Sequence, residues 1–147
     1  MVRGRGDTEM AGQEEAVIDA SVAVKWFSEE EGTDRAIEVR ESHVEGGRSL
    51  VAPDLIVYEV ANALRFKPGF DHEKVARAVG DLLDLQLDLI EPGKELLSIG
   101  SELAFRYGIT AYDSCYLALG ELMGIEVYTS DRQLYERARE SGLLRFL

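Results

Sequence analysis

The fold is decided by a stretch near the amino terminus, residues 15–24, which reads EAVIDASVAV. Its apolar run, residues 16–18, lies between charged residues, which predicts a short buried strand that ends at Asp19. Ser21 is expected to cap a short apolar helix over residues 22–27, because a serine hydroxyl can accept a hydrogen bond from the first helical turn. A carboxylate that closes a buried strand has little structural purpose, so Asp19 is the first candidate functional residue.

The rest of the chain alternates short apolar strands with longer helices. Strands are expected over residues 49–52, 87–90, 125–128 and 143–147. Helices are expected over residues 33–44, 53–66, 71–86, 96–107, 110–123 and 131–141, with Pro53 in the first turn of the second. This alternation predicts an α/β fold with a mostly parallel central sheet that helices cover on both faces.

Length and composition indicate one globular domain. The chain has 147 residues, 46% of them hydrophobic, which suits a single core. Residues 1–14 are rich in Gly, Arg and Glu and have no apolar periodicity, so they are expected to form a flexible leader before a domain over residues 15–147. No apolar run approaches the roughly 20 residues that cross a bilayer, and no secretory signal is expected. A single cysteine, Cys115, points to a reducing compartment such as the cytoplasm.

The charge balance restricts the kind of ligand. With 16 basic and 28 acidic residues, the net charge is −12. Such an excess of acid argues against broad, charge-driven coating of nucleic acid. It leaves open an acidic site that reaches a phosphate group through a metal ion.

Three more acidic residues occupy positions that invite a functional interpretation. Asp131 follows the expected strand at 125–128, and Asp19 follows the first strand, so the two carboxylates share one crevice if these strands are neighbours. Glu59 and Asp113 interrupt otherwise apolar helical stretches. An unpaired carboxylate is costly to bury there, so something must compensate its charge.

Each of these three residues also has a structural interpretation. Asp131 suits the N-cap of the helix that follows it, since Asp is favoured there. Asp113 and Thr110 fit the Thr-x-x-acid pattern of a capping box. Glu59 could form an ion pair with Arg65 or with another cation across the fold. Taken singly, none of the three establishes a site.

Taken together, the acidic residues make a stronger case. Four crowded carboxylates would repel one another and raise each other's pKa unless a cation neutralised them. Mg²⁺ or Mn²⁺ suits such a site, because these hard ions prefer oxygen ligands. A metal there can hold a water nucleophile and stabilise charge on a phosphoryl group, which predicts phosphodiester hydrolysis. The predicted ligands are Asp19, Glu59, Asp113 and Asp131.

Other candidate sites are weaker. His43 and His72 are isolated in the sequence, which disfavours a histidine–metal site or a Ser-His-Asp triad. No glycine-rich phosphate loop occurs. The aromatic pair Trp26 and Phe27 could stack on a base, but it is more typical of a core. Several basic side chains could contact an RNA backbone, although surface solvation explains each one alone: Lys25, Arg65, Lys67, Arg132, Arg137 and Arg139.

Four segments in this order resemble PIN-domain ribonucleases, and within that family they are most similar to the VapC-type toxins of prokaryotic toxin–antitoxin pairs. They are residues 17–21 (VIDAS), 52–64 (APDLIVYEVANAL), 110–119 (TAYDSCYLAL) and 129–134 (TSDRQL). The resemblance extends from about residue 15 to the carboxyl terminus. It implies a three-layer α/β/α sandwich.

The resemblance also implies a function and partners. It implies a Mg²⁺- or Mn²⁺-dependent endoribonuclease in which the four acidic residues hold the metal and position water, with Asp19 and Asp113 as the most direct ligands. Ser21 and Thr129 match positions that carry small hydroxyl residues beside those acids. The implied partners are an RNA substrate, a second copy in a homodimer and an antitoxin protein that places a basic side chain in the acidic site.

Two other functions compete with this interpretation. A non-cleaving PIN-fold module would bind RNA or protein as a regulator, but all four acidic positions are filled here, which favours the enzyme. A phosphoacceptor receiver domain would need an acidic pair just before Asp19 and a lysine after Tyr128, and the sequence has neither.

Overall fold

A computed structural model describes residues 14–147, so the expected leader lies outside the described residues except for Glu14, which begins the first strand. The strands of the described part are β1 (Glu14–Ile18), β2 (Arg48–Pro53), β3 (Asp88–Ile90), β4 (Val127–Thr129) and β5 (Leu144–Phe146). Its helices are α1 (Ala20–Val24), α2 (Thr33–Val44), α3 (Leu55–Leu64), α4 (His72–Asp84), α5 (Lys94–Tyr107), α6 (Ala111–Met123), α7 (Arg132–Ala138) and the 3₁₀ turn η1 (Arg139–Ser141). Over residues 14–147, none of these helices is both long and apolar enough to traverse a bilayer.

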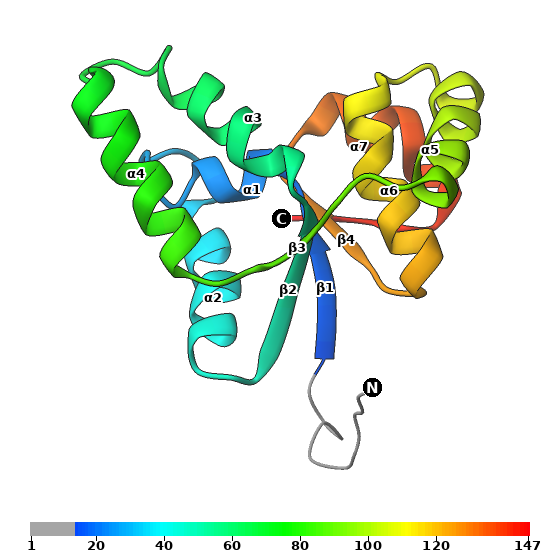
Figure 1. Ribbon diagram of the computed structural model, residues 1–147, viewed down its shortest axis with the longest axis horizontal. Helices are drawn as coiled ribbons and strands as arrows, with labels where there is room; N and C mark the ends of the chain where they lie inside the picture. Colours follow the sequence, from blue (N-terminus) through cyan, green and yellow to red (C-terminus); the bar gives the residue numbers. More distant parts are fainter. Residues whose placement is uncertain (1–13) are drawn as a thin grey trace.

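The five strands form one sheet in the order β3-β2-β1-β4-β5, and every neighbouring pair is parallel. The sheet lies between α2 and α4 on one side and α5 and α6 on the other (Figure 1). The predicted α/β class and the helical layers on both faces are therefore confirmed, and the sheet, expected to be mostly parallel, is entirely so.

The strand order places a crevice beside β1. From this central strand the chain first builds β2 and β3 on one side and later β4 and β5 on the other. Val17 pairs with Val127 and Ile18 with Tyr128, so the carboxyl ends of β1 and β4 are adjacent. Ligands of open parallel sheets bind where the strand order reverses in this way.

The core forms because the central strands are apolar on both faces. Val17, Ile18 and Leu50 are inaccessible to solvent, and α6 packs on both of the strands that carry them. Trp26 belongs to this core, where its indole N–H donates to the Ala36 carbonyl at 2.7 Å. The aromatic pair that includes Trp26 is thus structural.

Most predicted elements are shifted by one to three residues at an end, and three of the differences have a clear physical cause. Helix α1 begins at Ala20, because Asp19 and not Ser21 caps it. Pro53 ends β2 and does not open α3; the next residue, Asp54, donates its N–H to the Ile90 carbonyl and so continues the ladder past a residue that has no N–H. The last helix is α-helical only to Ala138 and then tightens into the 3₁₀ turn.

The close packing of α6 on β4 predicts opposite effects for two glycine substitutions. A Cβ at Gly120 would collide with the Val127 side chain and lie 3.0 Å from the Ile125 carbonyl oxygen, whereas a Cβ at Gly80 in α4 would meet nothing within 4 Å. We expect Gly120→Ala to lower the free energy of unfolding by about 1–3 kcal/mol and Gly80→Ala to raise it by up to about 1 kcal/mol. Urea denaturation of both variants measures this; a neutral Gly120→Ala would mean that the packing is looser than described.

Candidate active site

Asp19 lies at the carboxyl end of β1 with only 4% of its surface exposed. Its Oδ1 accepts hydrogen bonds from the Ser21 hydroxyl at 2.5 Å and from the Val22 N–H at 3.3 Å. Its Oδ2 accepts from the Thr129 hydroxyl at 2.5 Å. The carboxylate is therefore the N-cap of α1 and is also tied to the end of β4.

Ser21 and Thr129 join the two strand ends. The Ser21 hydroxyl accepts a hydrogen bond from the Ser130 N–H at 2.8 Å, and the Thr129 hydroxyl accepts one from the Asp131 N–H at 3.0 Å. These bonds fix the backbone that leads from β4 to Asp131. Both residues lie beside the acids, where the sequence interpretation expected supporting hydroxyl groups.

Asp131 is the N-cap of α7, where its Oδ1 accepts from the Leu134 N–H at 3.1 Å. The structural role considered for this residue is therefore real. One carboxylate oxygen remains outside that bond, and it belongs to a half-buried residue at the mouth of the crevice. Asp131 can thus serve both the helix and a ligand.

Asp113 stands in the first turn of α6. Thr110 caps this helix, and its hydroxyl accepts from the Asp113 N–H at 3.0 Å. A groove of about 340 Å³ has Asp113, Asp131 and Arg137 in its walls. Arg137 is held there by donating to the Gly108 carbonyl at 2.8 Å. The two carboxylates therefore face open space that one phosphate-bearing ligand can enter.

Glu59 projects from α3 and is held by a residue that sequence reasoning missed. Its Oε1 accepts from the hydroxyl of Tyr116 at 2.6 Å, and Tyr116 is 1% exposed. Burial raises the pKa of Tyr116, and the nearby Glu59 carboxylate raises it further, so the phenol stays protonated and donates. The signal was present: Tyr116 follows Asp113 by three positions, which places both on one side of α6.

The carboxylates interact through their charges. Burial raises the pKa of Asp113, and the Asp131 charge raises it further. Burial also raises the pKa of Glu59, against the hydrogen bond from Tyr116, and the Asp113 charge adds to the increase. Asp113 is thus the electrostatic centre of the group.

The same effects act most strongly on Asp19. Burial raises its pKa to about 6, although the hydrogen bonds from Ser21, Thr129 and the Val22 N–H oppose the increase. The charge of Asp113 raises it further. The hydrogen bonds of the protein therefore compensate the charged form of Asp19 only in part.

The four carboxylates have no basic partner within the described part of the chain. Within residues 14–147, no Lys, Arg or His forms an ion pair with Asp19, Glu59, Asp113 or Asp131. In the same region no three Asp, Glu, His or Cys side chains are already arranged to hold an ion. The topology brings the four carboxylates to one edge of the sheet and couples them pairwise. The oxygen-only donor set fits a hard divalent cation.

The remaining candidates have structural explanations. His43 accepts from the Leu50 N–H at 3.1 Å through Nδ1, and its Nε2 lies 2.8 Å from the Leu85 carbonyl oxygen, so it links α2 to the sheet. Glu30 pairs with Lys67 at 2.7 Å and with Lys25 at 3.4 Å, which accounts for both lysines. Glu59 does not pair with Arg65, which stacks on Phe66.

Comparisons with known proteins agree with this architecture. The model of the PIN domain family matches residues 16–140. Ribonuclease VapC3 from Pyrobaculum aerophilum is 33% identical over 125 residues, which cover 82% of this chain and 92% of that protein.

Solved structures share the fold. Mycobacterium tuberculosis VapC20, a toxin that cleaves the sarcin–ricin loop, has a TM-score of 0.65 at 16% identity, covering 79% of this chain and 89% of that chain. VapBC2 from Rickettsia felis, bound to a fragment of promoter DNA, has a TM-score of 0.65 at 10% identity; the match covers 90% of this chain and 98% of that chain. A toxin–antitoxin complex from Klebsiella pneumoniae has a TM-score of 0.63 at 14% identity, covering 88% and 95%.

The raised pKa of Asp19 predicts that Asp19→Asn stabilises the protein in EDTA. The folded-state pKa of about 6 exceeds the ordinary 3.8, so the cost of the charged form is absent below pH 4, grows between pH 4 and 6 and is complete above pH 6. The gain at pH 7.5 is expected to approach about 3 kcal/mol, because one pKa unit corresponds to about 1.4 kcal/mol. In the variant, the hydroxyl of Ser21 or Thr129 can accept a hydrogen bond from the introduced side-chain NH₂ instead of donating one to a carboxylate oxygen.

Chemical denaturation of the wild type and the variant at pH 4 and pH 7.5 measures this difference. Asp71→Asn is the control, because the backbone N–H of Lys74 lowers the pKa of that exposed N-cap, and no gain is expected at pH 7.5. An Asp19→Asn variant less stable than the wild type at pH 7.5 in EDTA would contradict the interpretation.

Proposed function

The chain belongs to the PIN-domain family and is a VapC-type ribonuclease toxin, and we propose that it hydrolyses RNA phosphodiester bonds at the acidic crevice beside β1. One observation carries the proposal: the carboxyl ends of β1 and β4 and the first turn of α6 bring uncompensated carboxylates together where the strand order reverses. A metal-dependent ribonuclease needs such a place for a divalent cation and a phosphate group.

The proposed cofactor is Mg²⁺ or Mn²⁺, held by Asp19 and Asp113 with Glu59 and Asp131 around them. The fit rests on the donor set, which offers carboxylate oxygens without a competing Lys or Arg in residues 14–147. When bound, such an ion lowers the pKa of a water molecule and stabilises negative charge on the phosphoryl oxygens.

The side chains of this chain have distinct roles in the proposed reaction. Ser21 and Thr129 orient the Asp19 carboxylate, and each bond is 2.5 Å long. Tyr116 occupies one oxygen of Glu59, which leaves Oε2 to hold the attacking water. Arg137, in the wall of the groove that contains Asp113, is placed to contact the substrate's phosphate backbone.

A non-cleaving regulatory module is the competing function. It would use the same fold to bind RNA or protein, and it would have no need of a buried, uncompensated Asp19. The desolvation that raises the pKa of Asp19 is a cost without benefit in such a module. The geometry therefore favours the enzyme.

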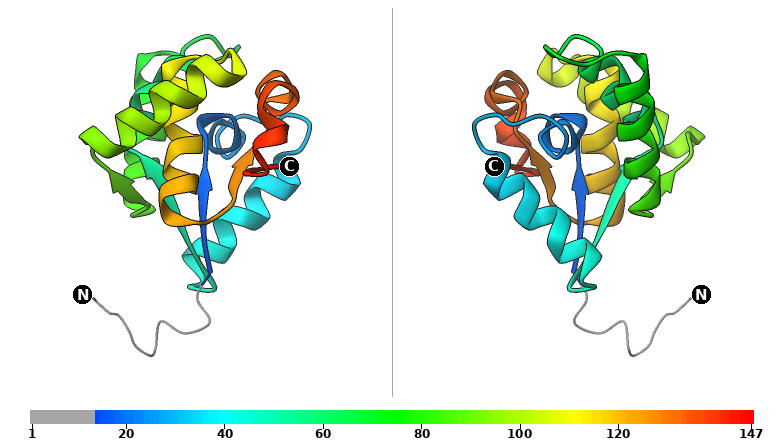
Figure 2. Two further views of the ribbon diagram at one scale, coloured as in Figure 1. Left: turned by 90° about the vertical axis from the view of Figure 1, so that its right-hand side faces the viewer. Right: turned by 90° about the vertical axis from the view of Figure 1, so that its left-hand side faces the viewer.

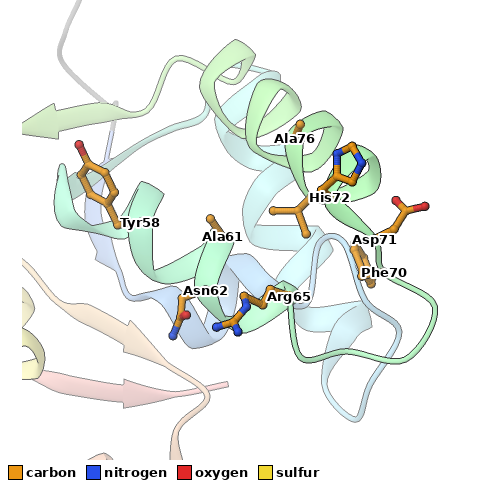
Figure 3. A pocket seen from close by; sticks show the side chains of 9 residues that line it. Tyr58, Ala61, Asn62, Arg65, Phe70, Asp71, His72 and Ala76 are labelled. Atoms are coloured by element: carbon orange, nitrogen blue, oxygen red, sulfur yellow. The ribbon is translucent and has the colours of Figure 1, made fainter.

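An antitoxin is proposed to bind along α3. A groove of about 620 Å³ runs between α3 and α4, with Ala61 on one wall and Phe70 and Val75 on the other. Figure 3 shows Tyr58, Ala61 and Phe70 around this space. Helix α3 also carries Glu59, so an antitoxin segment seated in the groove can extend a basic side chain toward the carboxylates. The net charge of −12 on this chain would attract such a basic segment.

A homodimer is the proposed active species, acting in the reducing cytoplasm. Phe105 near the end of α5 is 92% exposed, and Tyr112 at the start of α6 is 62% exposed. Exposed aromatic residues on adjoining helix ends are typical of interfaces. Tyr112 precedes Asp113, so a second copy docked here would lie beside the acidic crevice.

Removal of either central carboxylate tests the proposed chemistry. We expect Asp19→Asn and Asp113→Asn each to lower Mn²⁺-stimulated RNA cleavage by about a hundredfold or more, because each removes a ligand of the ion. Circular dichroism should show an intact fold. Asp81→Asn, an exposed aspartate on α4, is the control and should cleave like the wild type. Unchanged cleavage by both crevice variants would overturn the site assignment.

Sedimentation at micromolar concentration tests the dimer. Phe105→Ser should shift the wild-type dimer toward monomer and reduce cleavage with it, because the substitution removes the most exposed large apolar side chain of the described part. Phe66→Ser removes a phenyl group that is 70% exposed at the end of α3 and should leave the dimer intact. A fully active wild-type monomer would contradict the proposal.

A further inference from the structure

A second cavity adjoins the acidic crevice, and most of the charged side chains that line it are basic. Its volume is about 270 Å³, and Lys25, Arg35, Ser130 and Arg132 are in its walls. Ser130 lies between Thr129 and Asp131, so this cavity and the crevice share the segment that leaves β4. Figure 2 shows α7 close to the carboxyl terminus, on which it packs through β5. Arg132 at the start of α7 and Leu147 at that terminus both line the cavity.

Two of the basic side chains that line the cavity have no carboxylate partner in residues 14–147. Neither Arg35 nor Arg132 forms an ion pair with any carboxylate in residues 14–147. Lys25 shares Glu30 with Lys67 and donates to the Glu31 carbonyl at 2.6 Å. Three cationic side chains thus line the cavity, together with the acidic side chain of Glu31 and the carboxyl-terminal residue, Leu147. Such a cluster of basic side chains contrasts with the net charge of −12 on the chain.

Arg132 is held in place before any ligand binds. Its guanidinium lies 4.4 Å from the centre of the Phe146 ring, and Phe146 is itself packed against Tyr135 at 5.6 Å between ring centres. Stacking on a ring face leaves the N–H groups at the edge of the guanidinium free to donate. A fork of donors held in this way suits the oxygens of a phosphate group.

The Ser130 hydroxyl gives an independent indication of a ligand. Its Oγ is buried and has no hydrogen-bond partner among the described residues. Buried hydroxyl groups are rarely left without a partner. The backbone N–H of the same residue is satisfied by Ser21, so the backbone is fixed while the side chain lacks an acceptor.

We propose that Arg35, Arg132 and the Ser130 hydroxyl form a subsite for a phosphate group of the RNA substrate. The inference rests on the proposed function, because the subsite would hold a phosphate neighbouring the bond that is cleaved. Arg35 and Arg132 supply charge and N–H donors, and the Ser130 hydroxyl donates to a phosphate oxygen. Arg137 lies in the other groove, which Asp113 and Asp131 line. An RNA strand that runs from this groove to the basic cavity would therefore pass over the carboxylates.

A double variant, Arg35→Gln with Arg132→Gln, tests the subsite through RNA affinity. Binding of a fluorescent single-stranded RNA is measured by anisotropy with Mn²⁺ in the Asp113→Asn background, over a series of salt concentrations. We expect affinity to fall about tenfold at roughly 100 mM salt, and the slope of log affinity against log salt to decrease by about 1. In the cleaving chain, KM should rise while kcat stays unchanged. Ser130→Ala should weaken RNA binding without lowering Tm, since it loses no internal hydrogen bond.

The matched control removes the same charge elsewhere. Arg77→Gln with Arg106→Gln changes two exposed arginines on α4 and α5 and should alter affinity less than twofold. If the Arg35/Arg132 variant binds RNA like this control, the subsite is overturned, even where Mn²⁺-dependent cleavage shows that the proposed function stands. If the wild type binds RNA through the subsite but never cleaves it, the proposed function fails and the subsite remains.

Two RNAs of one sequence identify the source of the phosphate. An RNA with a 5′-phosphate and one with a 5′-hydroxyl are compared on the wild type and the double variant. An equal loss of affinity for both supports a backbone phosphodiester in the subsite. A loss confined to the 5′-phosphorylated RNA supports a terminal phosphate monoester. No loss for either RNA overturns the subsite.

Discussion

The structure depends on a carboxylate that closes the central strand of the sheet. Asp19 is almost inaccessible to solvent. Its negative charge is stabilised by hydrogen bonds from Ser21, Thr129 and the Val22 N–H, and not by any cation in residues 14–147. Those bonds reduce the desolvation cost but do not cancel it, since the pKa remains raised. Because they also tie β1 to β4, the same group that is costly to bury holds the crevice together.

The other acidic residues follow from how the helices pack on this sheet. Gly120 lets α6 approach β4 closely, and the start of that helix carries Asp113 toward the end of β1. Tyr116, one turn further along α6, reaches across to Glu59 on α3. The carboxylates are therefore placed by rigid elements, and Asp131 is fixed as a helix cap as well. A site built in this way can tolerate mutual repulsion without unfolding, and the repulsion is what makes it receptive to a divalent cation.

Sequence patterns predicted those features that depend on local composition. The apolar run before Asp19 correctly predicted a buried strand, and the capping pattern of Thr110 correctly predicted the start of a helix, because capping is local chemistry. The convergence of Asp19 and Asp131 was conditional on β1 and β4 being neighbours, which only the register establishes. The hydrogen bond between Tyr116 and Glu59 joins residues 57 positions apart, so a local sequence pattern could not predict it.

Misplaced features have similar causes. Pro53 resembles the first residue of a helix and lies instead at a strand end, because its neighbour continues the ladder. Lys25 and Lys67, considered as possible contacts to an RNA backbone, instead both pair with Glu30. Such pairings depend on tertiary contacts that a local pattern does not encode.

The net charge of −12 affects how such a protein can approach a polyanion. Charges separated by more than about 8 Å are largely screened at physiological salt, so the overall negative charge matters less than the side chains nearest each phosphate. Lys25 and Lys67, which could have contacted RNA, are tied to Glu30, whereas Arg35, Arg132 and Arg137 remain free of carboxylate partners in the described part of the chain. In the proposed subsites, RNA affinity would depend on these few arginines beside the carboxylates. RNA that does not place phosphates there gains little attraction and meets an acidic surface, so the charge distribution that weakens general binding also favours selection of the strand that fits.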